Sequence, residues 1–175
     1  MLKPGDPAPN FDLPAANNDR VERVSLAKIS FELILIFFYP RDFSFICPTE
    51  VTGFNHARDQ FSAENTALLG ASVDDADSHL RWARELGGIG FPLLADQDGK
   101  LARGFGVFDE TEQVALRATF ILDRQRKVAF SLACPLNVGR SVGEMVRLVS
   151  ALRCNRLCPA DWTPGVQFGP SDRKF

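Results

Sequence analysis

The feature that most constrains the fold of this chain is a near-continuous apolar run, Leu33-Ile34-Leu35-Ile36-Phe37-Phe38-Tyr39. The run is far shorter than the roughly 20 apolar residues that a membrane-spanning helix needs. It also lacks the alternating polar positions of a strand with one face in water. The run therefore predicts a central β-strand that is buried on both faces, as in α/β proteins.

The remaining apolar patterns supply the other elements of such a fold. Asp75 is placed to cap a helix that runs to about Leu86 and stops before Gly87-Gly88, and Ser141 with Glu144 forms a capping-box pattern. Several prolines before residue 15 indicate an extended lead-in. The order of the elements predicts an α/β, thioredoxin-like fold, with a central mixed sheet flanked by helices. The predicted helices are 48–62, 75–86, 100–104 and 141–152, and the predicted strands are 33–39, 67–73, 91–95, 118–122 and 127–132.

Length and composition fit one domain. The chain has 175 residues, 45% of them hydrophobic, which is enough for a single sizeable core. We expect residues 1–158 to form the domain and residues 159–175, rich in proline and glycine, to form an irregular C-terminal arm. A net charge of −2 with dispersed basic residues indicates neither a nucleic-acid partner nor a membrane surface. Because the first residues lack the apolar segment of a secretory signal, we expect a cytoplasmic protein.

Cys47 lies between the apolar run and the next predicted helix, and this position has chemical consequences. The free N–H groups at a helix N-terminus favour a thiolate there. Ionisation alone gives only a few-fold gain in rate, because nucleophilicity falls with basicity. Neighbouring groups must therefore orient a substrate and stabilise departing charge. Close to Cys47 in the sequence, the groups that could do this are the Ser44 hydroxyl and the Arg41 cation. The alternative is that Cys47 has no catalytic role, because a lone cysteine beside a strand is more often a small buried hydrophobic residue.

The segment Phe38–Glu50 resembles the active-site signature of peroxiredoxins, Pro-x-x-x-Thr/Ser-x-x-Cys, here Pro40, Ser44 and Cys47. The resemblance runs from about Pro4 to Trp162. It implies a thiol-dependent peroxidase in which Cys47 attacks hydrogen peroxide or an organic hydroperoxide and becomes a sulfenic acid. It also implies that Pro40 shields the thiol.

The same resemblance implies roles for three charged residues. The segment around Arg117 is similar to the one that carries the active-site arginine of peroxiredoxins, so Arg117 and Ser44 would polarise the peroxide. Glu50 would belong to a hydrogen-bonded cluster with Arg140. Read without the resemblance, Glu50 is simply a solvated acid that complements the helix dipole.

A second cysteine motif, Leu157-Cys158-Pro159-Ala160-Asp161-Trp162, resembles the resolving segment of typical two-cysteine peroxiredoxins of the alkyl hydroperoxide reductase C group. The resemblance implies that Cys158 captures the Cys47 sulfenic acid as a disulfide before over-oxidation. The two cysteines would come from different subunits of a head-to-tail homodimer, which can close into a decameric ring. A thioredoxin-like or flavoprotein disulfide reductase would reduce the disulfide, and no metal, haem or flavin is required.

Several alternatives stay open. The connection at residues 153–157 is shorter than is usual in the family, which leaves open which subunit supplies the resolving thiol. Cys154 is either a competing resolving thiol or part of an extended helix, and Cys134 is more simply a core residue. No zinc site is expected, because the two histidines are distant in sequence and a fourth ligand is missing. The alternative functions are a single-cysteine peroxidase resolved by an external thiol, and a non-enzymatic holdase or redox-relay protein.

Overall fold

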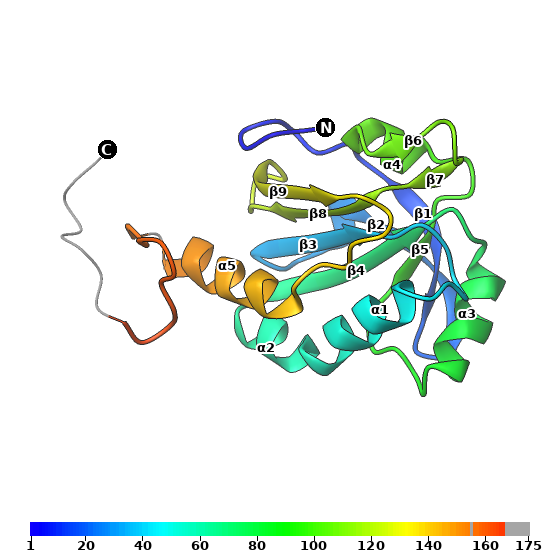
Figure 1. Ribbon diagram of the computed structural model, residues 1–175, viewed down its shortest axis with the longest axis horizontal. Helices are drawn as coiled ribbons and strands as arrows, with labels where there is room; N and C mark the ends of the chain where they lie inside the picture. Colours follow the sequence, from blue (N-terminus) through cyan, green and yellow to red (C-terminus); the bar gives the residue numbers. More distant parts are fainter. Residues whose placement is uncertain (155, 167–175) are drawn as a thin grey trace.

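The computed structural model describes residues 1–154 and 156–166, and its centre is a seven-stranded sheet of order β2-β1-β5-β4-β3-β8-β9. Helices α1, α2 and α5 cover one face of this sheet and α4 lies on the other (Figure 1). The strands are β1 (Asp12–Asn17), β2 (Arg20–Ser25), β3 (Leu33–Phe38), β4 (Thr66–Ser72), β5 (Leu93–Ala95), β6 (Phe108–Asp109), β7 (Val114–Ala115), β8 (Arg117–Leu122) and β9 (Val128–Cys134). The helices are η1 (Leu26–Lys28), α1 (Cys47–His56), α2 (Arg58–Ala63), α3 (Ala76–Glu85), α4 (Lys100–Phe105) and α5 (Val142–Cys154).

The apolar run forms the central strand β3, as predicted, and all six of its residues are buried. β3 pairs parallel with β4 and antiparallel with β8, so the sheet is mixed. Successive side chains of a strand point to opposite faces, and this divides the interior into two cores. Ile34, Ile36 and Phe38 belong to one core, whereas Leu35 and Phe37 belong to the other.

Several parts of the fold differ from the sequence prediction, among them the short strands β6 and β7 and the helix η1, which are not predicted from the sequence. The predicted helix 48–62 is two helices, α1 and α2, that meet at Ala57, whose ψ of 0° departs from the α-helical value of about −42°. The lead-in also contains an unpredicted hairpin, β1–β2, which extends the sheet beyond β5. Pro14 and the charged, largely exposed strand β2 hide the strand pattern there.

Helix α5 carries the chain away from the sheet towards the C-terminal arm. Its first turn is capped by Ser141, whose Oγ accepts from the backbone N–H of Glu144 at 3.2 Å. The helix packs on α2, where Ser150 donates to Glu64 at 2.7 Å. It ends at Cys154, two residues beyond the prediction, and residues 156–166 contain no helix or strand. The part of the predicted arm after residue 166 lies outside the described residues.

Candidate active site

Four segments of the fold converge on Cys47. Cys47 is the first residue of α1, directly after the loop that leaves β3, and Glu50 lies one turn further along the same helix. Arg117 begins β8, the strand beside β3. Arg140 lies just before α5. All four residues are buried, so the charged groups among them must satisfy one another.

Arg117 is held directly against the Cys47 sulfur. Its Nη1 atom lies 3.4 Å from Cys47 Sγ and 2.6 Å from Glu50 Oε2. Its Nε atom donates to the carbonyl of Leu136 at 2.7 Å, which fixes the other edge of the guanidinium. Burial opposes the charge of Arg117, but the bonds to Cys47 and Glu50 outweigh it and raise the pKa of Arg117. A fixed cation therefore faces the sulfur.

Glu50 is the centre of the cluster. Arg140 donates to both of its oxygens, from Nε at 2.7 Å and from Nη2 at 2.9 Å, and the backbone N–H of Arg140 adds a bond of 2.9 Å. Burial by itself would raise the pKa of Glu50, yet the bonds from Arg140 and Arg117 hold it below its ordinary value. Glu50 is therefore an ionised bridge between the two arginines. The alternative interpretation of Glu50, as a solvated acid on the surface, is therefore wrong, because Glu50 is buried.

Ser44 and Pro40 lie in the loop that leads into α1. The backbone N–H of Cys47 donates to Ser44 Oγ at 3.4 Å, which leaves the Ser44 hydroxyl proton available for another acceptor. Pro40 is half-buried, and Arg41, the local cation in the sequence, is exposed. Because Cys47 is 0% exposed, a substrate reaches its sulfur only when some of the residues that cover it move.

The loop is anchored by a buried residue that sequence reasoning missed, Asp42. Its carboxylate accepts from the Tyr39 hydroxyl at 2.9 Å and the Ser78 hydroxyl at 3.0 Å, and it lies 2.9 Å from His79 Nδ1. Burial and the negative charge of Asp42 raise the pKa of Tyr39 well above its ordinary value. Asp42 gives no sign of its burial in the sequence, because an acid in a loop is ordinarily exposed.

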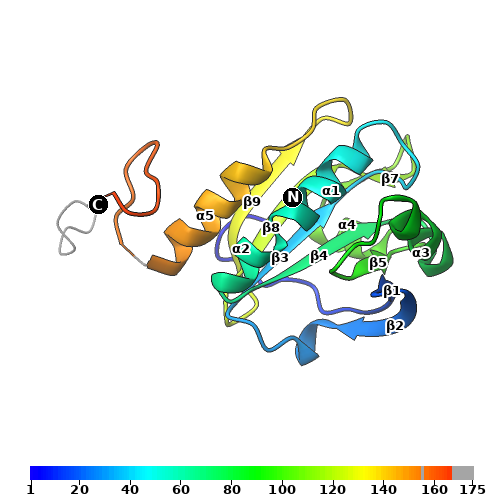
Figure 2. The same ribbon diagram turned by 90° about the horizontal axis from the view of Figure 1, so that it is seen from below.

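The two C-terminal cysteines lie together and far from Cys47. Cys154 Sγ and Cys158 Sγ are 3.4 Å apart, and both residues are half-buried. Both views of the molecule place the arm beyond the end of α5, on the opposite side from the loop that enters α1 (Figures 1 and 2). The structure therefore does not bring Cys47 and Cys158 together within one chain.

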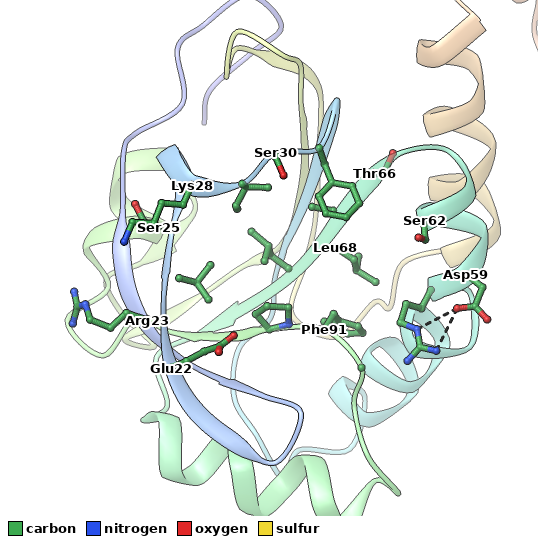
Figure 3. Close-up of a pocket in the computed structure, with 18 residues that line it drawn as sticks. Glu22, Arg23, Ser25, Lys28, Ser30, Asp59, Ser62, Thr66, Leu68 and Phe91 are labelled. Carbon is green, nitrogen blue, oxygen red and sulfur yellow. Dashed lines mark hydrogen bonds and ion pairs between the residues drawn. The ribbon is translucent and has the colours of Figure 1, made fainter.

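Away from Cys47, the features that could indicate another function are metal-binding groups, membrane-spanning helices and hollows. Within residues 1–154 and 156–166 there is no group of three His, Cys, Asp or Glu residues that could hold a metal ion. None of the helices in the same ranges is long and apolar enough to cross a membrane. A hollow of ≈ 460 Å³ lies between the β2–η1 segment and α2, beside the Arg58–Asp59 ion pair (Figure 3), and none of the predicted site residues lines it.

Comparisons with known proteins show the family to which the chain belongs. Residues 4–131 match the model of the AhpC/TSA family. The chain is 40% identical over 171 residues to peroxiredoxin prdx-2 of Caenorhabditis elegans, covering 92% of this chain and 85% of that protein. It is 39% identical over 171 residues to peroxiredoxin-2 of Bos taurus, covering 92% of this chain and 86% of that protein.

Solved structures of peroxiredoxins have the same fold as this chain. The reduced 2-Cys peroxiredoxin of Plasmodium vivax superposes with a TM-score of 0.89 and 32% identity, over 96% of this chain and 93% of that chain. AhpC of Mycobacterium tuberculosis superposes with a TM-score of 0.84 and 30% identity, over 93% of this chain and 99% of that chain. The fold is therefore thioredoxin-like, and the chain belongs to the AhpC/TSA family and is a peroxiredoxin.

Proposed function

We propose that Cys47 is the peroxidatic cysteine of a thiol-dependent peroxidase that reduces hydrogen peroxide and organic hydroperoxides. The observation that carries the proposal is the contact of Arg117 with the Cys47 sulfur at 3.4 Å, in a cluster whose only carboxylate, Glu50, is already shared with Arg140. A guanidinium in this position has a donor to spare for an incoming oxygen. A buried structural cysteine needs no such cation.

The first step follows from this arrangement. The Cys47 thiolate attacks one oxygen of the peroxide, the O–O bond breaks, and the leaving oxygen departs as water or an alcohol after it takes up a proton. Arg117 and the Ser44 hydroxyl stabilise the negative charge that moves onto the leaving oxygen. Cys47 is left as a sulfenic acid. Pro40 shields the sulfur on the loop side and has no N–H that would compete for the thiolate.

We propose that Cys158 resolves this sulfenic acid from another copy of the chain, with release of water. Arg140 contacts Glu50, and the 13 residues of α5 that follow span about 20 Å. The four residues from Cys154 to Cys158 can span at most about 14 Å when fully extended. Since a disulfide adds about 5.5–6 Å between its two Cα atoms, Cys158 would reach Cys47 of its own chain only if these residues ran fully extended back along α5, which favours capture by another copy.

Assembly of two copies is supported by the sheet. β9 is an edge strand of the sheet. At its start, Val128 exchanges backbone hydrogen bonds with Gly5 and Asp6, and no strand of the described residues pairs with the outer side of the rest of β9. This remaining edge can pair with β9 of a second copy across a two-fold axis. We propose a homodimer that can close into a decameric ring, with residues 159–175 acting as an arm of the domain formed by residues 1–158. A thioredoxin-like or flavoprotein disulfide reductase would regenerate the enzyme, in the cytoplasm, without a cofactor bound to this chain.

Removal of single thiols tests the proposal. Peroxide consumption would be measured with a dithiol reductant for Cys47→Ser, Cys158→Ser and the matched control Cys134→Ser, with Cys134 half-buried at the end of β9. We expect loss of activity for Cys47→Ser, activity only with a small-thiol reductant for Cys158→Ser, and full activity for Cys134→Ser. Full activity of Cys47→Ser would overturn the assignment. Negligible turnover of the unmodified protein would favour a holdase or redox-relay role.

A further inference from the structure

The end of α5 and the segment that follows it hold two thiols, Cys154 and Cys158, where resolution of a sulfenic acid requires one. Cys154 is the last residue of α5, and Cys158 follows in the non-helical segment after it. Their sulfurs are 3.4 Å apart, so a disulfide bond of about 2.05 Å requires them to approach by only about 1.4 Å. Cys158 already lies outside the helix, so helical hydrogen bonds do not fix its backbone.

We propose that Cys154 and Cys158 form a dithiol pair that takes over the oxidising equivalents from Cys47. This inference rests on the proposed peroxidase function and extends it. In the step, the Cys154 thiolate attacks the Cys158 sulfur of the Cys47–Cys158 disulfide. The Cys154–Cys158 bond forms, the Cys47–Cys158 bond breaks, and Cys47 leaves as a thiolate, so no further oxidant or reductant is consumed. The external reductase then acts on the Cys154–Cys158 disulfide rather than on the buried Cys47.

The surroundings of the two thiols favour this order of events. Cys158 lines an apolar hollow of ≈ 450 Å³, with Leu148, Leu152 and Leu157 among the other residues around it, whereas Cys154 is not part of its lining. The Cys154 thiol instead donates to the carbonyl of Ala151 at 3.0 Å, within its own helix. Cys158 is thus the thiol that a chain docked in this hollow would meet.

The direction of the exchange follows from the two possible leaving groups. Burial and the neighbouring Cys154 raise the pKa of Cys158, which makes Cys158 a poor leaving group. The departing Cys47 thiolate is stabilised by the guanidinium of Arg117. Attack at the Cys158 sulfur with expulsion of Cys47 is therefore the favoured exchange.

The pair can be tested without any peroxidase activity. Cys47→Ser protein would be equilibrated in glutathione buffers of graded composition, alkylated and digested with trypsin. The sequence places each cysteine on its own tryptic peptide, with Cys154 on 154–156, Cys158 on 157–173 and Cys134 on 128–140. We expect a disulfide between the peptides 154–156 and 157–173 of one chain, without a covalent link between chains. Cys134 is the matched control, and we expect it in no intrachain disulfide. Cys154 and Cys158 both free, or Cys158 paired only between chains, would overturn the proposal.

The transfer itself is tested by one equivalent of hydrogen peroxide and a rapid acid quench. In the unmodified protein, a Cys47–Cys158 linkage should appear first and give way to Cys154–Cys158, with the Cys47 thiol restored. In Cys154→Ser, the Cys47–Cys158 linkage should persist until reductant is added. A stable Cys47–Cys158 linkage in both proteins would refute the transfer. If Cys47 is not oxidised at all, the proposed peroxidase function fails, whereas the glutathione experiment still decides whether the dithiol pair exists.

Discussion

Arg117 and Arg140 both bind Glu50, but only Arg117 contacts the Cys47 sulfur, and this difference separates chemistry from structural support. We therefore compare Arg117→Lys with Arg140→Lys, since both substitutions keep the positive charge. Lysine has a point charge instead of a planar fork, so it cannot hold Glu50 or the Leu136 carbonyl and still present a donor at the sulfur.

The expected magnitudes differ for the two variants. Loss of one preorganised donor to a transition state costs about 10²–10³ in rate, or about 2.7–4 kcal/mol, and we expect this loss for Arg117→Lys. Its stability should fall by about 1.5–3 kcal/mol, for one charge-assisted hydrogen bond. The Arg140 side chain makes four hydrogen bonds, to Glu50, Ala118 and Thr119. Arg140→Lys should therefore lose at least two of these bonds, about 3 kcal/mol or more, with less than about a tenfold loss in rate.

The assay measures two quantities for each variant. A rapid-quench experiment with one equivalent of peroxide gives the second-order rate constant of Cys47 oxidation, and urea unfolding gives the free energy of unfolding. Rates would be measured well below the unfolding midpoint of each variant, so that only folded protein reacts. Equal losses of rate in Arg117→Lys and Arg140→Lys would refute the reasoning, because the cluster would then act only as structural support for the helix that begins at Cys47.

Three further predictions concern the same site. Ser44→Ala should slow Cys47 oxidation by about 10²-fold, whereas Ser44→Thr keeps the hydroxyl and should retain the rate, and a rapid-quench comparison checks this. Asp42→Asn leaves buried donors of the Tyr39–Ser78–His79 network poorly satisfied and should destabilise the fold by about 1.5–3 kcal/mol in urea unfolding. The pKa of Glu50 is lowered in the folded state. The contribution of Glu50 to the free energy of unfolding is therefore complete above the ordinary glutamate pKa of about 4.3, and it is lost as the pH falls through the folded-state pKa. Between pH 3 and 5, the free energy of unfolding of Glu50→Gln should therefore change less with pH than that of the unmodified protein. Parallel plots of the free energy of unfolding against pH for the two proteins would contradict this.

The sequence predicts the parts of the fold whose residues have strong local patterns. The run that forms β3 is apolar throughout, and Asp75 caps α3 by accepting from the Ser78 N–H at 2.7 Å, as expected. β2 could not be predicted in the same way, because Arg20, Glu22 and Arg23 interrupt its apolar residues and the strand is stabilised by pairing with β1.

In the site, too, only the residues with a strong local pattern could be predicted from the sequence without the family resemblance. Cys47 stands out by its place after a buried strand, but nothing near it in the sequence indicates that the cation is Arg117, 70 residues away, and only the family resemblance does so. The contact between Cys154 and Cys158 depends on where α5 ends, and helix ends are set by packing and capping more than by the apolar pattern. The position of Asp42 is likewise a property of the folded chain.

The most direct test of the central claim is to add one equivalent of hydrogen peroxide to the reduced protein and quench it with acid at the shortest accessible time. Non-reducing electrophoresis and peptide mass spectrometry would then identify the partner of Cys47. We predict a covalent dimer in which the peptide 42–58, with Cys47, is joined to the peptide 157–173, with Cys158, of a second chain. A Cys47 sulfenic acid that stays on monomers would contradict the two-cysteine mechanism, and an unreacted Cys47 would contradict the peroxidase assignment itself.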